Sequence, residues 1–502
     1  MRERFNGLDV PAEVFQNFLN ETVATGSAFF GDLDERRTIP AASVGDLKSL
    51  FDEPMPPAGT EVSELLDQVK RTVLPNSAMT VGPNYYGFVT SGGNQAGVIG
   101  EVLRALLNQN PAKWIMAPAA TEIELVVLRW IAEFIGYPTD SGGIMVSGGS
   151  EANLTCLKVA RDYQLGYGNQ DEGIRSRPQL TMYVSSQGHF CLDKSADVLG
   201  IGRTYLRKIP VNEDFTISPG QLERRVLEDK ASGLLPACII ANAGTVNTGA
   251  VDPLETLAGI ARRHGLWLHI DAAYGGPAAS TPLTRTMFRG FDLADSVATD
   301  AHKWLYAPFE AGIAFVRNRS LLRKSFSIVP DYLRDNENSD RTDPTEYHFE
   351  LSRDFKALKL WFAFKAYGTE RLRRAIEENI TTMQYLARLI DDTEDVERLA
   401  PVPLSIVCFR YRTGDRTLWN NESYLSMLNK RILSEIERDG RVFVSGTVLN
   451  GKQTLRACSV NHRTTRRHVK HLLDVIREVG VKVHRESLSE IRNGQVTHVH
   501  SL

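Results

Sequence analysis

Four short motifs combine chemically active side chains with small residues, and each accompanies an apolar run typical of a strand. The first is MVSGGSEANL at residues 145–154, in which Ser147 to Ser150 separate a strand from a helix. Glycines let the backbone approach a ligand closely, and a helix N-terminus offers free N–H groups to a phosphate. The motif matches neither GxGxxG nor GxxxxGK[ST], which argues against a dinucleotide site or a P-loop. Taken alone, it is equally compatible with a tight turn capped by serine.

The second and third motifs place a carboxylate and an amine near strand ends. LWLHIDAAYGG (266–276) ends an apolar strand at Asp271, and Ala273, two residues on, faces the same side. A carboxylate there needs a cation or hydrogen-bond donors, which a ligand can supply. It is also compatible with a helix cap or a structural ion pair. In SVATDAHKWL (296–305), Lys303 has apolar and aromatic neighbours. Partial desolvation makes such an amine a nucleophile or Schiff-base former, although a lone lysine is also compatible with a surface charge.

The fourth motif, SSQGHFCLDKSADVLG (185–200), places His189 just after a strand. A histidine there stacks on a flat ring or transfers protons, or is simply half-buried. A phosphate cradle, a carboxylate for a ring nitrogen, a Schiff-base lysine and a ring-stacking histidine together meet the needs of pyridoxal phosphate. HExxH, GxSxG and CxxC are absent from the sequence, and metals, nucleotides or a Ser-His-Asp triad give no comparable joint account.

The elements that position these motifs alternate along the chain. From about residue 95 to 370, apolar β-rich runs alternate with helical segments, which predicts an α/β fold with a mostly parallel, doubly wound sheet. Ligands of such sheets bind at the C-terminal ends of the strands. The six runs are GGIMVS, LTMYVS, ACIIANAG, LWLHIDAAYGG, SVATDAHK and AGIAFVR.

Pattern changes divide the chain into four parts. At about 150 residues per domain, 502 residues predict roughly three units. We expect a dimer-forming helical arm over 1–85, a large cofactor-binding domain over 86–370, a small α+β domain over 371–485, and a frayed tail over 486–502.

Composition excludes several classes of protein. Lys and Arg number 58 against 61 Asp and Glu, a net charge of −3 that does not indicate a nucleic-acid or membrane surface. The five cysteines are widely spaced, which argues against a disulfide framework or zinc knuckle and favours a reducing cytoplasm. The start MRERFNGLDV is unlike a signal peptide, and no apolar run approaches the ~18 residues of a membrane span. We expect a cytoplasmic protein that binds no metal, nucleic acid or membrane.

From about residue 80 to 480, the sequence resembles the group II pyridoxal-phosphate-dependent amino-acid decarboxylases, which include aromatic-amino-acid, glutamate and histidine decarboxylases. The resemblance implies fold type I, the aspartate-aminotransferase-like fold, with a seven-stranded central sheet. It also implies an obligate homodimer with active sites at the interface and an arm that wraps the partner. The segments that carry the resemblance are YYGFVTSGG, NQNPAKWIMAPAATEIE, VSGGSEANL, HIDAAYGG, TDAHKWL, SRDFKALKLWFAFKAYG and LRACSVNHRTT.

The resemblance implies a role for each matching position. Lys303 is the lysine that forms the Schiff base with the cofactor, Asp271 is the partner of the pyridine nitrogen, and His189 stacks on the ring. The other implied cofactor contacts are Ala273 on the far face of the ring, Gly149 and Ser150 at the phosphate with His302 close by, and Thr245 near the phenolic oxygen.

Asp300 departs from this pattern, because relatives often carry an asparagine there that touches the phosphate. A carboxylate beside a phosphate dianion is repulsive unless it is protonated or turned away. We therefore expect Asp300 to contact the cofactor as a protonated or turned-away carboxyl.

The implied reaction converts an L-amino acid to its amine and CO2. The substrate amine displaces Lys303, and the ring accepts the electrons of the broken bond while Asp271 keeps its nitrogen protonated. The carbon must then regain a proton, which the family supplies from a tyrosine on a mobile loop. The matching stretch is 328–355, where Tyr347 is the expected donor and Tyr332 and His348 are its competitors.

Two other outcomes remain open. Without a well-placed acid, the carbanion reacts with oxygen to give an aldehyde, ammonia and peroxide. A lyase or aminotransferase on the same fold is the other possibility, and aminotransferases usually hold the substrate carboxylate with an arginine. Arg353 is available for that purpose and is equally compatible with a structural role. An aromatic substrate is favoured by aromatic residues that are also compatible with the core, namely Tyr85, Tyr86, Phe88 and Trp114.

Overall fold

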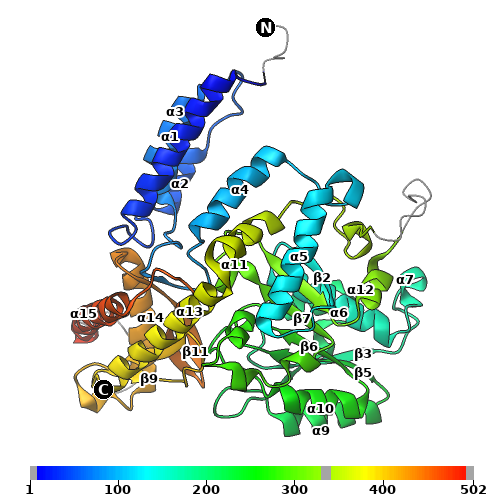
Figure 1. Cartoon of the computed structure of the whole chain (residues 1–502). Helices are drawn as coiled ribbons and strands as arrows, with labels where there is room; N and C mark the ends of the chain where they lie inside the picture. Colours follow the sequence, from blue (N-terminus) through cyan, green and yellow to red (C-terminus); the bar gives the residue numbers. More distant parts are fainter. Residues whose placement is uncertain (1–7, 329–340, 493–502) are drawn as a thin grey trace.

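The computed structural model describes residues 8–328 and 341–492. Within these residues, a buried seven-stranded sheet forms the centre of the larger part of the chain (Figure 1). β8 runs antiparallel to both of its neighbours, and the other neighbouring strands pair in parallel. The predicted mostly parallel α/β sheet is therefore confirmed. In order across the sheet, the strands are β2 (Gly142–Val146), β8 (Gly312–Val316), β7 (Ser296–Asp300), β6 (Trp267–Asp271), β5 (Leu235–Asn242), β3 (Leu180–Ser185) and β4 (Leu206–Ile209).

The edge strand β4 is absent from the six runs that the sequence predicts. Two of its four residues, Arg207 and Lys208, are charged and are not buried. The other six strands, which include β2 at the opposite edge, are almost entirely buried and read as continuous apolar runs. The four-residue strand β4 lacks that signal.

Helices pack on both faces of the sheet and form a separate hydrophobic core on each. One face carries α6 (Gly149–Gln164), α8 (Cys191–Val198) and α12 (Arg319–Phe326). The other face carries α5 (Pro118–Ile135), α9 (Pro219–Ala231), α10 (Leu254–His264) and the start of α13 (Ala357–Asp391). Shorter or peripheral helices are α4 (Gln95–Leu107), α7 (Asn169–Glu172) and α11 (Ala301–Trp304).

A second sheet and its own core form the C-terminal part of the structure. The second half of α13 packs against this core, after a break at Gly368, whose φ of 67° lies in the left-handed region. The break lies close to the expected boundary at 370. The strand order is β1 (Tyr85–Tyr86), β11 (Phe443–Leu449), β12 (Lys452–Cys458), β10 (Ile406–Tyr411) and β9 (Val396–Arg398), and the helices are α14 (Glu422–Asp439) and α15 (Arg466–Arg492).

The expected tail from residue 486 is wrong in its first part, because α15 continues to Arg492. Val479 and Val483 are buried on one face of the helix, and Ser487, four residues further on, is buried on the same face. Glu490 also pairs with Arg431 at 2.6 Å. A small polar residue continues the buried face here, so the apolar pattern ends before the helix does. Residues 493–502 lie outside the described part of the chain.

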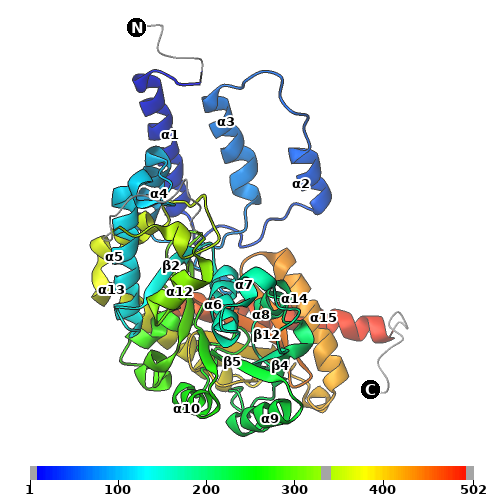
Figure 2. The same ribbon diagram turned by 90° about the vertical axis from the view of Figure 1, so that its right-hand side faces the viewer.

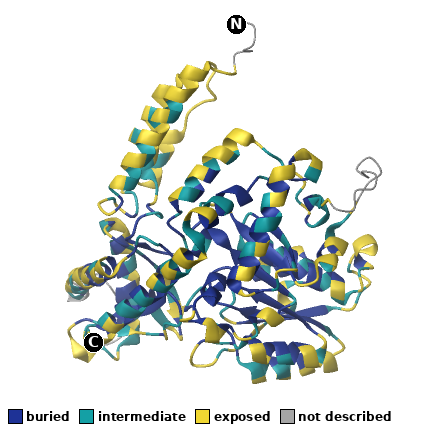
Figure 3. Cartoon of the chain, viewed as in Figure 1, coloured by how far each residue is buried: buried dark blue, intermediate teal, exposed yellow. Residues whose placement is uncertain are grey.

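The N-terminal arm projects away from both sheets (Figures 1 and 2). It comprises α1 (Ala12–Gly31), α2 (Val44–Phe51) and α3 (Val62–Gln68), and none of the residues in these helices is buried. Figure 3 shows the arm as exposed or intermediate along its whole length. The connection after α1 is anchored on the small sheet's side, where the Thr38 hydroxyl donates to the Gly440 carbonyl at 3.0 Å.

No helix among the described residues is long and apolar enough to cross a membrane.

Candidate active site

A cavity of about 560 Å³ opens where the parallel strands of the large sheet end. Loops after β2, β3, β5, β6 and β7 line one side, and residues of β11 and β12 line the other. Eight of the nine residues expected to contact a cofactor lie on this lining: Gly149, Ser150, His189, Asp271, Ala273, Asp300, His302 and Lys303. Sequence motifs more than 150 residues apart thus meet in one cavity, because each follows a strand that ends at the same edge of the sheet.

Lys303 enters the cavity from α11, the short helix that follows β7. Its Nζ lies 2.9 Å from Oδ2 of Asp300. Burial lowers the pKa of Lys303, but the charge and hydrogen bond of Asp300 outweigh that effect and raise the pKa above its ordinary value. The amine is therefore held as an ammonium ion until a ligand replaces this contact.

Asp271 is the last residue of β6 and lies on the cavity wall. Burial raises its pKa, and the positive charge of Lys303 opposes that rise. The backbone N–H of Ala273 donates to Asp271 Oδ1 at 3.2 Å, which also favours the ionised carboxylate. A buried carboxylate of this kind is suited to hold a proton on a ring nitrogen.

The turn between β2 and α6 leaves room for a ligand at the helix N-terminus. A Cβ on Gly149 would lie 2.8 Å from Asp300 Oδ2 and 2.9 Å from Ala273 Cβ, so only glycine fits there. The hydroxyl and N–H of Ser147 both donate to Glu151 Oε2, which fixes the turn from outside the cavity. The remaining N–H groups at the start of α6 suit a phosphate.

His302 and Asp300 complete this end of the cavity. The Nδ1 of His302 accepts the backbone N–H of Ala311 at 3.0 Å, which leaves Nε2 facing Asp300 Oδ2 at 3.7 Å. Burial lowers the pKa of His302. Asp300 is 1% exposed, and its Oδ1 has no hydrogen-bond partner among the described residues. Its carboxylate is turned toward Lys303, which is one of the two ways to relieve repulsion from a phosphate.

His189 lies after β3 and presents its ring to the cavity. Its Nδ1 accepts the N–H of Cys191 at 3.2 Å, and burial lowers its pKa. A neutral, partly buried imidazole in this position is suited to stack on a flat ring.

Thr245 is buried behind the wall rather than on it. Its hydroxyl oxygen accepts the N–H of Ala250 at 3.1 Å and lies 3.0 Å from Thr248 Oγ1, while its neighbours Gly244 and Val246 line the cavity. The structure therefore does not bring the Thr245 side chain to the lining.

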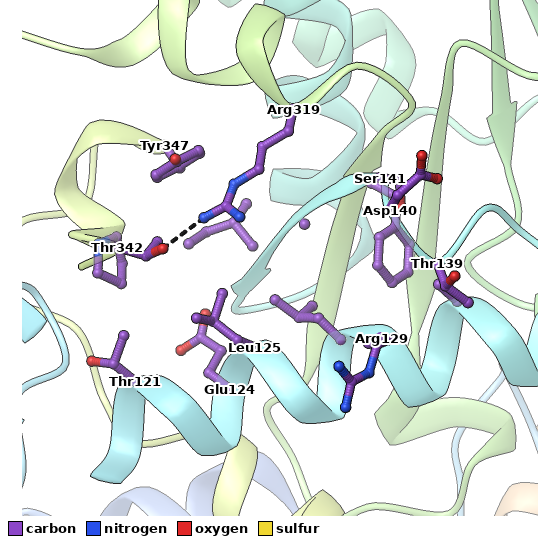
Figure 4. Close-up of a pocket in the computed structure, with 16 residues that line it drawn as sticks. Thr121, Glu124, Leu125, Arg129, Thr139, Asp140, Ser141, Arg319, Thr342 and Tyr347 are labelled. Atoms are coloured by element: carbon purple, nitrogen blue, oxygen red, sulfur yellow. Dashed lines mark hydrogen bonds between the residues drawn. The ribbon is translucent and has the colours of Figure 1, made fainter. Parts of the chain in front are cut away.

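The structure does not place Tyr347 in this cavity. Tyr347 lines a separate cavity of about 230 Å³ between α5, β2 and the start of α12 (Figure 4). Its ring carries the Arg319 guanidinium 5.1 Å from the ring centroid. Within the described residues Tyr347 thus lies beside α5 and β2, outside the cavity of Lys303, and its role as proton donor stays a prediction.

Of the two competing donors, the structure describes only His348, which is also not on the lining of the cavity of Lys303. His348 is buried, with Nε2 3.0 Å from Thr155 Oγ1 and Nδ1 accepting the N–H of Glu350. Burial lowers the pKa of His348 to about 4. Tyr332 lies outside the described residues.

Arg456, which the sequence reasoning missed, lines the cavity from β12. It is 3% exposed and donates through Nη1 to the Phe88 carbonyl and to Ser445 Oγ. Its Nε and Nη2 have no partner among the described atoms, so a buried cation offers free N–H groups. Arg353, the arginine considered from sequence, is instead buried against Glu124 at 2.6 Å and has a structural role.

The aromatic residues that could line a substrate pocket lie in different parts of the structure. Phe88 lines the cavity and is 61% exposed, and Phe309 joins it from the loop after α11. Tyr86 is part of the core of the small sheet. The indole N–H of Trp114 donates to Glu122 Oε1 at 2.8 Å, away from the cavity lining.

The sheet and this site define a fold type I enzyme of the pyridoxal-phosphate class. Comparison with known proteins supports the same class. Residues 45–412 match the model of the pyridoxal-dependent decarboxylase conserved domain. The chain belongs to the pyridoxal-dependent decarboxylase family, and it is a pyridoxal-phosphate-dependent amino-acid decarboxylase.

Individual relatives cover nearly the whole chain. An aromatic-L-amino-acid decarboxylase of Bacillus atrophaeus is 34% identical over 87% of this chain and 89% of its own length. A phenylacetaldehyde synthase of Petunia hybrida is 30% identical over 89% of this chain and 90% of its own length. The crystal structure of Oryza sativa TDC with PLP and tryptamine has a TM-score of 0.89 and 26% identity, and the match covers 95% of this chain and 99% of that one.

Proposed function

We propose that this enzyme decarboxylates an aromatic L-amino acid to the corresponding amine. The observation that carries the proposal is the meeting of Lys303, Asp271 and His189 in one cavity, with Phe88 and Phe309 on its wall. The relative from Bacillus atrophaeus is an aromatic-L-amino-acid decarboxylase, which supports the same substrate class. The aromatic rings supply apolar contact area for a flat side chain.

The residues present fit pyridoxal phosphate. When bound, this cofactor supplies an electron sink for the electrons of the breaking carbon–carboxylate bond. The Gly149 turn and the start of α6 would hold the phosphate, because a side chain at Gly149 would fill that space. Lys303 would bind the cofactor's aldehyde carbon, and Asp271 would hold the proton on its ring nitrogen.

The other side chains orient the substrate and the cofactor ring. His189 and Ala273 would lie on opposite faces of the ring, with His302 and Ser150 near the phosphate. The unpaired Nε and Nη2 of Arg456 would contact an acceptor of the substrate other than the carboxylate that is lost.

A direct test of the site uses Lys303. We expect a yellow protein whose visible absorption disappears on borohydride reduction, with the reduced label attached to Lys303. Lys303→Ala should lack the visible band and lose turnover. A Lys303→Ala variant with wild-type turnover would refute the assignment.

A second outcome, oxidative deamination to an aldehyde, is supported by the similarity to a phenylacetaldehyde synthase. Among the described residues, Tyr347 lies outside the cavity, and the hydroxyl of Tyr274, which lines it, is hydrogen-bonded to Ser405. Incubation with aromatic L-amino acids while CO2, amine, aldehyde and peroxide are measured separates the two outcomes. Equal amounts of CO2 and amine without peroxide support the amine-forming reaction, whereas aldehyde and peroxide support the alternative.

We also propose that the enzyme is a homodimer whose arms and α4 helices form the interface. α4 exposes an apolar row on a helix next to the arm (Figures 1 and 3), comprising Ile99, Val102, Leu103, Leu106 and Leu107. Large exposed apolar patches of this kind mark interaction surfaces. Leu103→Glu/Leu106→Glu should lower the mass measured in solution to that of a monomer. Leu227→Glu, a matched change at an exposed leucine on α9, should leave the dimer intact.

A reducing cytoplasm is the proposed compartment. All five cysteines are buried free thiols, and none is paired in a disulfide. Microscopy of the tagged chain in its own cell tests this proposal, which a secreted or periplasmic signal would contradict.

A further inference from the structure

Asn153 joins two parts of the cavity wall that come from different elements. It lies in the first turns of α6 and lines the cavity. Its Nδ2 donates to the Gly149 carbonyl at 2.8 Å. The same side chain contacts β6 through His269, and Asp271 lies two residues beyond His269 at the end of that strand. One amide thus links the start of α6, the phosphate end of the proposed cofactor site, to the strand that carries the ring-nitrogen end.

A buried chain of hydrogen bonds holds Asn153 from behind. His269 Nε2 lies 2.7 Å from Asn153 Oδ1. His269 Nδ1 lies 2.9 Å from Ser296 Oγ, and the Trp267 indole N–H donates to that oxygen at 2.8 Å. His269 and Asn153 are at most 1% exposed, so water does not compete for these contacts.

The chemistry of the end groups fixes the direction of every bond in this chain. An indole N–H only donates, so Ser296 Oγ accepts from Trp267 and has its own proton free to donate to His269 Nδ1. At the other end, the Gly149 carbonyl only accepts, so the contact atom of Asn153 is its NH2 group. Asn153 Oδ1 must then accept from His269 Nε2–H. One tautomer of a neutral His269 satisfies all of these contacts.

His269 stays neutral over the working range of pH, because burial lowers its pKa to about 3. In the neutral tautomer, Nδ1 accepts from the Ser296 hydroxyl while Nε2–H donates to Asn153 Oδ1. The orientation of Asn153 is therefore fixed before any ligand binds.

We propose that Asn153 is a positioning residue for the cofactor, oriented by His269, that fixes the Gly149 turn and the Asp271 carboxylate relative to each other. This inference rests on the proposed function, in which Gly149 contacts the phosphate and Asp271 the ring nitrogen. Neither Asn153 nor His269 needs to touch the reacting atoms for this role.

The Asn153 Nδ2 also lies 3.8 Å from Cys191 Sγ, and a thiol sulfur is a weak acceptor. Burial raises the pKa of Asp271, and the nearby Asn153 side chain lowers it. Asn153 therefore helps to keep Asp271 ionised, the state in which it holds a proton on the ring nitrogen.

The test measures the affinity of the cofactor-free full-length enzyme for pyridoxal phosphate and the visible spectrum of the bound form from pH 6 to 9. Asn153→Asp keeps the shape but presents acceptors to Gly149 and Asp271, and Asn153→Ala removes the contacts. We expect both to weaken affinity by roughly 10- to 100-fold. We also expect the visible band to change its pH dependence, which a loss of stability alone would not cause.

The matched control is Asn429→Ala. Asn429 is equally buried, and its amide bridges Tyr411 and α14 in the small domain. It should lower thermal stability without changing the affinity or the spectrum. If Asn429→Ala and Asn153→Ala lower the affinity equally, the effect of Asn153 is merely structural and the inference fails.

Two further comparisons test whether Asn153 acts through Asp271 and whether His269 orients it. In an Asp271→Asn background, Asn153→Ala should cost less affinity than in the wild type, because part of its effect passes through Asp271. His269→Gln retains an N–H donor for Asn153 and should keep more affinity than His269→Leu. Additive losses, or equal affinities of the two His269 variants, would overturn the inference. A wild-type protein that binds no pyridoxal phosphate would instead refute the proposed function.

Discussion

Lys303 Nζ and Asp300 Oδ2 form an ion pair of 2.9 Å within a single turn of chain at the end of β7. The Asp300 side chain is 2% exposed, and the Lys303 side chain is 22% exposed. A lysine must lose a proton before it attacks an aldehyde, and this partner opposes that loss. We therefore expect the pair to control how readily the free enzyme takes up its cofactor.

Replacing Asp300 by Asn should increase the reactivity of Lys303 near neutral pH. Asp300 raises the pKa of Lys303 against the lowering effect of burial, so its removal lets that pKa fall. Each unit of decrease gives about tenfold more neutral amine at a pH below the pKa. The visible band should appear faster after pyridoxal phosphate is added at pH 7, and the rate should level off at lower pH.

Rates measured from pH 6 to 10 by stopped flow check this prediction. Asp295→Asn changes a carboxyl just before the other end of β7 and should leave the profile as in the wild type. Identical profiles for Asp300→Asn and wild type would show that the ion pair does not hold the proton.

Arg456 should control substrate affinity rather than cofactor affinity. Arg456 lines the cavity, and its buried Nε and Nη2 have no hydrogen-bond partner or counter-ion among the described residues. We expect Arg456→Gln to raise KM by about 10-fold or more, the effect of losing a hydrogen bond to a charged group. Cofactor affinity should change little.

Steady-state kinetics and cofactor titration of the same preparation separate these effects. Arg410→Gln is the matched control, because Arg410 is equally buried on the small sheet but pairs with Glu397 and Glu422. A rise in KM for both variants would point to a general disturbance of the small domain.

Acid should destabilise the enzyme through buried neutral histidines. Burial lowers the pKa of His462 to about 3, from about 6.5 in an unfolded chain. Between these values the unfolded state binds more protons, so stability falls as pH decreases below 6.5. His462 then accounts for about 2 kcal/mol of the loss between pH 7 and pH 5.

His462→Phe should reduce this pH dependence, since phenylalanine does not titrate and retains a ring facing Tyr306. Urea unfolding of wild type and variant at pH 5 and pH 7 measures the difference. If the free energy of unfolding changes equally between pH 5 and pH 7 in wild type and variant, His462 is already charged in the folded enzyme.

Much of the site follows from the sequence because its residues are tied to strand ends. Asp271 and Lys303 each follow a buried apolar run, and the shared edge of a parallel sheet brings such positions together. Gly149 is predictable for a similar reason, since a glycine-rich turn connects a strand to a helix. The local pattern and the sheet topology are sufficient for these residues.

Other residues depend on contacts that no local pattern contains. Arg456 reaches the cavity from a different sheet, and its lack of a counter-ion is a property of the folded structure. Asn153 and His269 look like ordinary core residues in sequence. Tyr347 lines a different cavity from Lys303, and its position along the chain does not determine which cavity it reaches.

The proton donor is the decisive point for the product. We expect Tyr347→Phe to keep the wild-type ratio of amine to aldehyde, because the Tyr347 ring lies against Arg319 in a separate cavity. No hydrogen bond of its hydroxyl is present among the described contacts, so stability should change by less than about 0.5 kcal/mol. Product analysis by chromatography, with peroxide measured in parallel, checks both statements.

Tyr332→Phe is the informative comparison, because Tyr332 is the other tyrosine of the 328–355 stretch. If the enzyme forms amine and Tyr332 donates the proton, this variant should shift the product toward aldehyde and peroxide while CO2 release continues. The same shift in Tyr347→Phe would instead show that Tyr347 reaches a substrate, and its position beside Arg319 would then not be the one it holds during turnover.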